Sequence, residues 1–470
     1  MGRLQTEQDN VPGLLYLLSD VSSQVTGTEL HISGGCNHFY AALHDNLKII
    51  NLITVSILFK QGLFPMIPVE EAKRLVLDSI SKLEIERMPI LESLGRVLAQ
   101  DIKATDDIPV YDNSAMDGYA VIANDVKGAD ESYPVRLVIA GGSIPAGKLT
   151  GKKIDPGYCV PIMTGGMMPE GADAVVIKED VQRDGKSILV FREVMKGENV
   201  RYRGEDIKKG DIVLRSHNSL SPASVGVLAS LGISRVKTFR PPVIGVIVTG
   251  NELIEINKKL NKAKVRDSNS YTLSAQVETA GARYNRYGIV ADDEALIRKN
   301  IEKALKENDI ILISGGTSMG EYDLVRDTLE EMNADLIFWR VSQKPGRPLT
   351  LYRIEGKPIF GLPGNPVSVM VCFEMYVRPL IRKMMGFNEL FRPLVKAEAL
   401  HEFRNKKGRT SFARVVLENK DGKYFFSSTG INGAGMLTSM VKANAIACFP
   451  PDMGYVKKGT IMEVYKIGCL

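Results

Sequence analysis

The spacing of hydrophobic and polar residues changes several times along the 470-residue chain. Shortly after residue 66, apolar residues recur at helical spacing at Ala72, Leu75 and Val76, behind an acidic first turn. That spacing predicts a helix. The first 65 residues show no clear period, and their apolar run 49–59 is shorter than the roughly 20 residues that span a membrane. We therefore expect no membrane span there.

From Pro109 the pattern changes to short β-rich runs separated by glycine and proline, which predicts a small β domain inserted into a helical one. The helical pattern resumes at Ser221, where serine can cap a helix whose first residue is Pro222. Gly232 is well placed to end that helix. The β-rich runs include 135–140, 174–178 and 187–191.

After Pro242 strand-like and helix-like segments alternate, and such βαβ units require a parallel sheet with helices on both faces. We therefore predict a doubly wound α/β domain, whose ligands would lie at the carboxyl ends of the strands. The expected elements are 243–248, 270–279, 286–290, 294–306, 309–314, 323–332 and 335–341.

Short strands return near the C-terminus and predict a small, barrel-like β domain. They are expected at 409–417, 423–428 and 460–467.

The complete pattern predicts an α/β multidomain fold. For the first 65 residues we considered a disordered extension, a partner-binding tail and a misplaced start with Met66 as the true first residue, and we favour the last. The predicted units are an extension (1–65), a helical linker domain (66–108 and 207–240), an inserted β domain (109–206), the α/β domain (241–392) and a C-terminal β domain (393–470).

Composition narrows the function classes. The 60 Lys and Arg residues against 55 Asp and Glu give a net charge of +5 without a basic block, so nucleic acid is a poor candidate partner. The five cysteines are scattered, odd in number and lack a CxxC pair. This favours buried thiols in a reducing cytoplasm over disulfides or structural zinc.

Several strand ends of the predicted α/β domain carry residues suited to ligand binding. Directly after one buried strand come Gly315, Gly316 and Ser318, whose backbone N–H groups can cradle an oxyanion, although a plain tight turn has the same composition. At another strand end, Lys344 and Arg347 flank a Pro-Gly turn. They are either surface cations or a pair that holds a phosphate, and the convergence of strand ends favours the phosphate.

A further strand end carries Asn365, which is placed to cap a helix beginning at Pro366, so that backbone donors point at whatever lies there. An ordinary helix start explains this pair equally well.

Acidic residues lie among these cationic ones, at Glu252, at Asp292 or Asp293, and at Asp323. Carboxylates near an anionic ligand indicate a bridging divalent cation or a heterocycle with amino donors. Asp292 or Asp293 could instead cap the helix that begins near Glu294. For Glu252 and Asp323 we see no such structural explanation.

Polar and glycine-rich segments also occur upstream, within the predicted β domain. Together with the strand ends, they resemble the molybdopterin molybdenumtransferase family, to which the E domain of gephyrin is similar. The resemblance covers about residue 66 to the C-terminus, and the matching segments follow the family's order. They are 113–120, 163–165, 203–207, 249–253, 314–323 and 363–368.

The resemblance implies an elongated homodimer that inserts molybdate into adenylyl-molybdopterin with the help of Mg²⁺ and releases AMP. It also implies transient contact with a molybdopterin adenylyltransferase and no nucleic-acid or membrane partner. The implied catalytic residues are Asp117, Thr164, Glu252, Asp292, Asp323 and Lys344, the implied substrate-binding residues are Arg203, Gly315, Gly316, Ser318, Arg347 and Asn365, and the implied metal ligands are Glu252 and Asp323.

Two positions depart from the family pattern, since Arg347 stands where many relatives have lysine and Asn251 where aspartate is common. Asp117 and Thr164 lie far upstream, so we hypothesise that they close the cleft of the dimer mate. A molybdopterin adenylyltransferase normally lacks the 113–120 segment and the C-terminal β domain, and a gephyrin-like scaffold is disfavoured because no adenylyltransferase domain is fused to the chain. Tungstate has almost the size and charge of molybdate and stays an alternative substrate.

Overall fold

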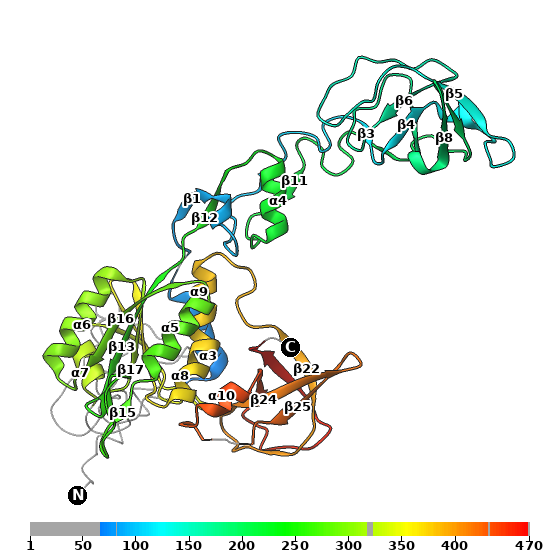
Figure 1. Ribbon diagram of the computed structural model, residues 1–470. Helices are drawn as coiled ribbons and strands as arrows, with labels where there is room; N and C mark the ends of the chain where they lie inside the picture. The colour runs from blue at the N-terminus through cyan, green and yellow to red at the C-terminus, as the bar shows by residue number, and fades with distance from the viewer. Residues whose placement is uncertain (1–65, 81, 317–322, 431–432, 469–470) are drawn as a thin grey trace, which may run out of the picture.

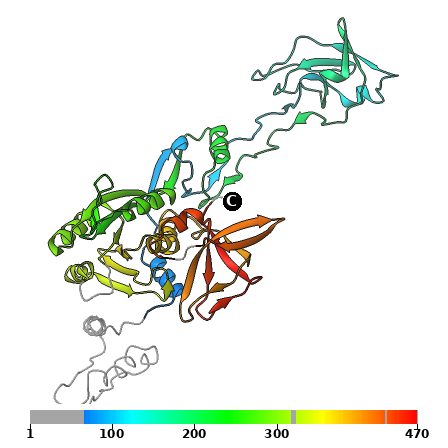
Figure 2. The ribbon, with the colours of Figure 1, turned by 60° about the horizontal axis from the view of Figure 1, so that its bottom comes forward.

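The computed structural model describes residues 66–470 apart from 81, 317–322, 431–432 and 469–470. The interpretations of residues 1–65 and the predicted role of Ser318 lie outside the described residues. The described chain is elongated (Figure 1). An α/β unit and a C-terminal β unit lie side by side at one end, and the inserted β unit lies at the other, as the rotated view in Figure 2 also shows. This is the α/β multidomain fold that the sequence predicts.

Helical segments connect these units. The predicted first helix is confirmed as α3 (Val69–Asp78), and it buries Ala72 and Val76 in the core of the α/β unit. The second is confirmed as α4 (Pro222–Ser230), where Ser221 and Ser224 form a mutual capping box. Gly232 follows this helix with φ 69°, as expected for a glycine past a helix end. Beside α4, β1 (Ile85–Pro89) pairs with β12 (Arg235–Phe239) and β2 (Ile102–Lys103) with β11 (Ile212–Leu214).

The inserted unit is a six-stranded sheet in the order β7-β4-β6-β5-β9-β8. Its strands are short because turns interrupt them, and their inward residues form a closed apolar core that includes Leu137, Val176 and Ile188. The three β-rich runs predicted here are confirmed as β5, β7 and β9. The strands are β3 (Asn113–Ser114), β4 (Gly118–Val121), β5 (Val135–Ile139), β6 (Tyr158–Ile162), β7 (Ala174–Ile177), β8 (Val181–Asp184), β9 (Ser187–Val190) and β10 (Val200–Arg201), the first pairing with the last.

The α/β unit contains a second six-stranded sheet, in the order β16-β13-β17-β21-β20-β18. Helices α5 and α8 pack on one face with α3 and α9, and α6 and α7 pack on the other. The bounds are β13 (Val243–Thr249), α5 (Asn269–Thr279), β16 (Arg283–Val290), α6 (Glu294–Glu307), β17 (Ile310–Ser314), α7 (Leu324–Glu331), β18 (Asp335–Trp339), β20 (Thr350–Ile354), β21 (Lys357–Leu362), α8 (Pro366–Cys372) and α9 (Arg378–Met384), with a small ladder of β14 (Leu253–Ile254) and β15 (Val265–Arg266).

The predicted parallel sheet with helices on both faces is confirmed, except for one antiparallel strand near an edge. Strands β16, β13, β17 and β21 run parallel, but β20 is antiparallel to both of its neighbours. The reason is a two-residue hairpin, because Glu355 (φ 52°) and Gly356 (φ 78°) join β20 directly to β21. Two successive left-handed residues form the tight turn that suits antiparallel strands.

The C-terminal unit is a closed barrel. Strands β24, β25, β22, β28 and β26 pair in that order, and β26 pairs back onto β24. A sixth strand, β19 (Gln343–Lys344), comes from the α/β unit and pairs parallel with β24. The bounds are β22 (Leu394–Ala399), β23 (Phe403–Arg404), β24 (Thr410–Lys420), β25 (Lys423–Ser428), α10 (Thr438–Lys442), β26 (Ala445–Phe449), β27 (Tyr455–Val456) and β28 (Ile461–Lys466).

One ion pair should fix the linker to the α/β sheet. Asp309 accepts two 2.7 Å hydrogen bonds from Arg240 and one of 2.8 Å from the Val243 backbone N–H. We expect Asp309→Ala to lower the free energy of unfolding of this unit by about 2–3 kcal/mol, because it leaves the partly buried guanidinium of Arg240 with one carboxylate partner, Glu84, instead of two and leaves the Val243 N–H without its acceptor. The chain's single tryptophan, Trp339, lies in β18 of the same sheet, so its fluorescence in a urea titration reports on this unit.

Asp335→Ala is the matched control, since Asp335 is two-thirds exposed and pairs with Arg353 at the surface. We expect that change to cost less than about 0.5 kcal/mol. Equal effects of the two substitutions would contradict the assignment.

Candidate functional site

The strand ends that carry the predicted site residues are neighbours in the sheet. Val248 is in register with Ser314, and Ser314 with Leu362, so β13, β17 and β21 end at one edge. The loops that follow these strands therefore share the carboxyl edge, where open α/β sheets bind ligands.

The glycines after β17 allow a close approach between strands. Gly315 (φ 96°) and Gly316 (φ 65°) are left-handed. A Cβ on Gly315 would come within 2.1 Å of the Thr249 carbonyl oxygen, and one on Gly316 within 2.6 Å of a Val325 methyl. Packing alone thus requires both glycines.

Asp323 is a helix N-cap, a structural role that the sequence analysis did not predict. It caps α7 by accepting a 3.1 Å hydrogen bond from the Arg326 backbone N–H. It is also 6% exposed, and this burial raises the pKa of its carboxyl to about 6. Asp323 is therefore a buried acid that titrates just below neutral pH.

The contacts of Asp292 and Asp293 show which of the two caps the helix. Asp293 caps α6 by accepting from the Leu296 N–H at 2.9 Å. Asp292 and Asn251 exchange side-chain to backbone hydrogen bonds of 2.9 and 3.1 Å. Asp292 thus fixes the turn that presents the exposed carboxylate of Glu252.

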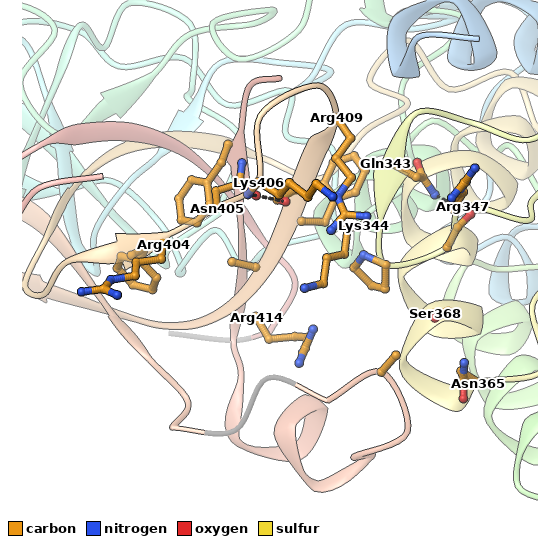
Figure 3. Close-up of a pocket in the computed structure, with 18 of the residues that line it drawn as sticks. Gln343, Lys344, Arg347, Asn365, Ser368, Arg404, Asn405, Lys406, Arg409 and Arg414 are labelled. Atoms are coloured by element: carbon orange, nitrogen blue, oxygen red, sulfur yellow. Dashed lines mark hydrogen bonds between the residues drawn. The ribbon is translucent and has the colours of Figure 1, made fainter. Parts of the chain in front are cut away.

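A basic pocket of about 330 Å³ lies between the 344–347 turn and the C-terminal barrel (Figure 3). Among the described residues that line it, none is acidic. The guanidinium Nε atoms of Arg347 and Arg409 are buried and have no hydrogen-bond partner within the described chain. Unsatisfied guanidinium donors in a pocket whose described lining has no carboxylate favour an anionic ligand. The cations of the pocket are Lys344, Arg347, Arg404, Lys406, Arg409 and Arg414.

Four of these six cations were missed by sequence reasoning. Arg404, Lys406, Arg409 and Arg414 belong to the C-terminal unit, some 60 residues beyond Lys344. The pairing of β19 with β24 sets Lys344 opposite Ser411 and so brings the two groups together. A basic run at 404–409 was the available signal, but its partner strand could not be read from the sequence.

Asn365 lines the opposite wall of the pocket with Ser368 (Figure 3). The predicted helix start is confirmed, since α8 begins at Pro366 and Asn365 is its N-cap residue. Its side chain makes no capping hydrogen bond in the described chain, so the amide is free to contact a ligand.

Asp117 and Thr164 pair with each other in the inserted unit. Asp117 accepts 2.8 Å hydrogen bonds from the Thr164 backbone N–H and hydroxyl, and these hold the pKa of its carboxyl below the ordinary value. Arg203 is bound through Nε to Asp107, a residue that the sequence reasoning overlooked, at 2.6 Å. Within the described subunit, this unit lies far from the α/β strand ends (Figure 1).

No group of three or more His, Cys, Asp or Glu side chains in the described part of the chain is arranged to hold a metal ion. Glu252 and Asp323 could thus supply only part of a coordination shell. No described helix is long and apolar enough to cross a membrane.

Comparisons with known proteins place three family models along the chain. The MoeA N-terminal region (domain I and II) matches residues 67–232, a probable molybdopterin binding domain matches 245–383, and the MoeA C-terminal region (domain IV) matches 396–467.

The chain aligns with almost the full length of its relatives. A molybdopterin molybdenumtransferase of Haemophilus influenzae is 34% identical over 403 residues, which is 85% of this chain and 98% of that protein. A putative molybdopterin biosynthesis protein of Methanocaldococcus jannaschii is 34% identical over 413 residues, with the same coverage. The crystal structure of a molybdopterin biosynthesis moeA protein from Pyrococcus horikoshii OT3 superposes with a TM-score of 0.73 at 34% identity, covering 86% of this chain and 100% of that one.

The buried charge of Asp323 predicts a pH-dependent stability difference. Because its folded pKa of about 6 lies above the value of 3.8 that is ordinary for an aspartate, wild type loses stability as pH rises from about 4 to 6. Asp323→Asn keeps a capping side chain without the charge. We expect the variant to be more stable than wild type by about 2 kcal/mol at pH 7.5 and to lose this advantage near pH 4, in urea titrations followed by Trp339 fluorescence. Stability curves that stay parallel across this range would show that Asp323 is not a buried acid.

Proposed function

The chain belongs to the molybdopterin molybdenumtransferase family, and from that premise we propose that it inserts molybdate into adenylyl-molybdopterin, giving molybdenum cofactor and AMP. The observation that carries the proposal is the basic pocket, which two units build beside the carboxyl edge of the sheet. Both molybdate and the phosphates of the adenylylated pterin are oxyanions, and this pocket has the charge that they require.

The residues around the pocket divide into two kinds of donor. Lys344 is an exposed point charge on the turn, suited to an oxyanion that must enter and leave. Arg414 is 5% exposed, and its Nε donates a 3.1 Å hydrogen bond to the Ser439 hydroxyl. Its guanidinium is therefore held in a fixed orientation. Cleavage of the phosphoanhydride requires mainly positioning and neutralisation of charge, which such donors supply.

A covalent thiol intermediate is disfavoured by the described cysteines. Burial raises the pKa of Cys159 and Cys372 to about 12, so both stay protonated at neutral pH. Buried free thiols also agree with the cytoplasmic location that we propose.

We propose that Glu252 and Asp323, which follow the neighbouring strands β13 and β17, hold a Mg²⁺ ion that is shared with the substrate. Such ions are commonly held by one or two carboxylates together with substrate phosphates and water, so two protein ligands suffice. The ion, when bound, would neutralise negative charge on the phosphates. Asp323, with a pKa of about 6, is ionised at neutral pH and able to take part.

We further propose that the enzyme works as a homodimer and receives its substrate through transient contact with a molybdopterin adenylyltransferase. The Asp117–Thr164 pair belongs to the inserted unit, which lies at the opposite end of the elongated subunit from the α/β unit (Figure 1). A partner subunit that brings this pair to the cleft would give it a role in the reaction.

Loss of Lys344 should abolish most of the activity. We expect Lys344→Ala to lower molybdate-dependent AMP release by roughly 100-fold or more, because the positive charge that stabilises the transferred oxyanions is removed. The assay combines purified protein, adenylyl-molybdopterin, Mg²⁺ and graded molybdate. Lys299→Ala, on the exposed face of α6, is the matched control and should retain wild-type rates. If wild type binds the pterin but releases no AMP at any molybdate concentration, the proposed activity is refuted.

Mixed dimers test the shared cleft. Asp117→Ala and Lys344→Ala subunits should each be nearly inactive alone, but random mixing gives hybrids in which one cleft has both wild-type residues. We therefore expect roughly a quarter of wild-type activity to return on mixing. Recovery would not occur if both residues had to come from one subunit.

A further inference from the structure

Asn269 ties together the ends of two strands and presents a buried oxygen at the same edge. It is the first residue of α5. Its Nδ2 donates to the Ser314 hydroxyl at 2.9 Å and to the Gly364 carbonyl oxygen at 2.8 Å. Because a carbonyl oxygen can only accept, the orientation of the amide is fixed. Oδ1 must therefore face away from both partners.

That oxygen is buried, yet no described residue donates to it. The hydroxyl of Thr249, at the end of β13, is buried and unpartnered in the same sense. Both atoms flank the glycine turn, since a Cβ on Gly316 would come within 2.8 Å of Thr249 Oγ1 and Ser314 precedes the turn directly. Buried polar atoms without partners are costly and rare, so two at one sheet edge indicate a ligand that completes them.

The chemistry of the two atoms defines what they can bind. An amide oxygen accepts, so Asn269 requires an N–H donor, and it is neutral, so it does not repel an anionic ligand. Asp292 and Asp323 already accept hydrogen bonds from the Asn251 and Arg326 backbone. Asn269 is thus the acceptor best placed to meet the donor edge of a heterocycle.

We propose that Asn269 Oδ1 accepts a hydrogen bond from the 2-amino group of the substrate's pterin ring, and that Thr249 donates to the neighbouring 4-oxo group. The inference rests on the proposed function, which supplies a pterin with an anionic tail. Gly364, held by Asn269, adjoins Asn365, which lines the basic pocket. Neutral hydrogen-bonding groups thus lie at one end of the edge and cations at the other, in the order in which a pterin with phosphates presents its groups.

A pair of small probes separates this role from general packing. Pterin (2-amino-4-oxopteridine) and lumazine (2,4-dioxopteridine) differ at one substituent, and the 2-oxo group of lumazine would face the Asn269 oxygen without a hydrogen. We expect the full-length wild type to bind pterin roughly tenfold or more tightly than lumazine, in fluorescence titrations of the two pteridines.

Three variants test which side-chain atoms produce the preference for pterin over lumazine. Asn269→Ala should bring pterin affinity down to that of lumazine, whereas Thr249→Val should weaken both ligands and leave their ratio unchanged. Ser314→Ala removes one tether of the amide but leaves Oδ1, so it should keep the selectivity. Asn285→Ala is the matched control, since that amide donates to Asn308 at the opposite end of the sheet.

The proposal is overturned if wild type does not bind pterin or does not prefer it, or if Asn269→Ala lowers thermal stability while the pterin-to-lumazine ratio persists. These outcomes are independent of the proposed activity. If the protein selects pterin but shows no molybdate-dependent AMP release, this inference stands and the proposed reaction is refuted. If it releases AMP but does not select pterin, the proposed reaction stands and this inference is refuted.

Discussion

The position of the turn between β19 and β20 is the constraint on which the site depends. Buried Gln343 donates from Nε2 to the Gly346 carbonyl oxygen at 3.0 Å, and the Tyr376 hydroxyl donates to its Oε1. A Cβ on Gly346 would come within 2.4 Å of the Cys372 sulfur, so only glycine fits there. The backbone of the same segment pairs with β24 of the barrel. One buried amide thus holds the turn against the α/β helices while its backbone joins the second unit, and this places Lys344 in the pocket.

The positive and negative side chains of the site come from different parts of the structure. The barrel and the turn supply cations, whereas the strand ends supply carboxylates that are partly committed to the fold, as Asp323 is to α7 and Asp292 to the Asn251 turn. Anchored carboxylates keep their geometry when a ligand arrives, which suits a site that works by positioning. The same anchoring explains why each of them is needed for structure as well as for the proposed chemistry.

Local sequence signals predicted the elements that depend on local interactions. The spacing of Ala72 and Val76 predicted α3, the Ser221-Pro222 pair predicted the start of α4, and apolar runs predicted β13 and β17. The strand ends also predicted that the residues after β13, β17 and β21 would meet, because parallel strands share one edge.

What the sequence did not predict depends on contacts between distant segments. The antiparallel β20 follows from a hairpin at Glu355 and Gly356 that does not carry a common turn signature. The capping role of Asp323 was missed because the predicted segment 323–332 began one residue early, which placed Asp323 inside the helix instead of at its N-cap. The barrel cations, such as Arg414, were missed because a strand of two residues, β19, brings them to the turn.

The most direct test of the account is a crystal structure of the protein with adenylyl-molybdopterin and molybdate. We predict an oxyanion between Lys344 on the turn and Arg414 on the barrel, with the pterin at the carboxyl edge of β13 and β17. A ligand held by the α/β unit alone, with the barrel cations in solvent, would contradict the claim that two units build one site.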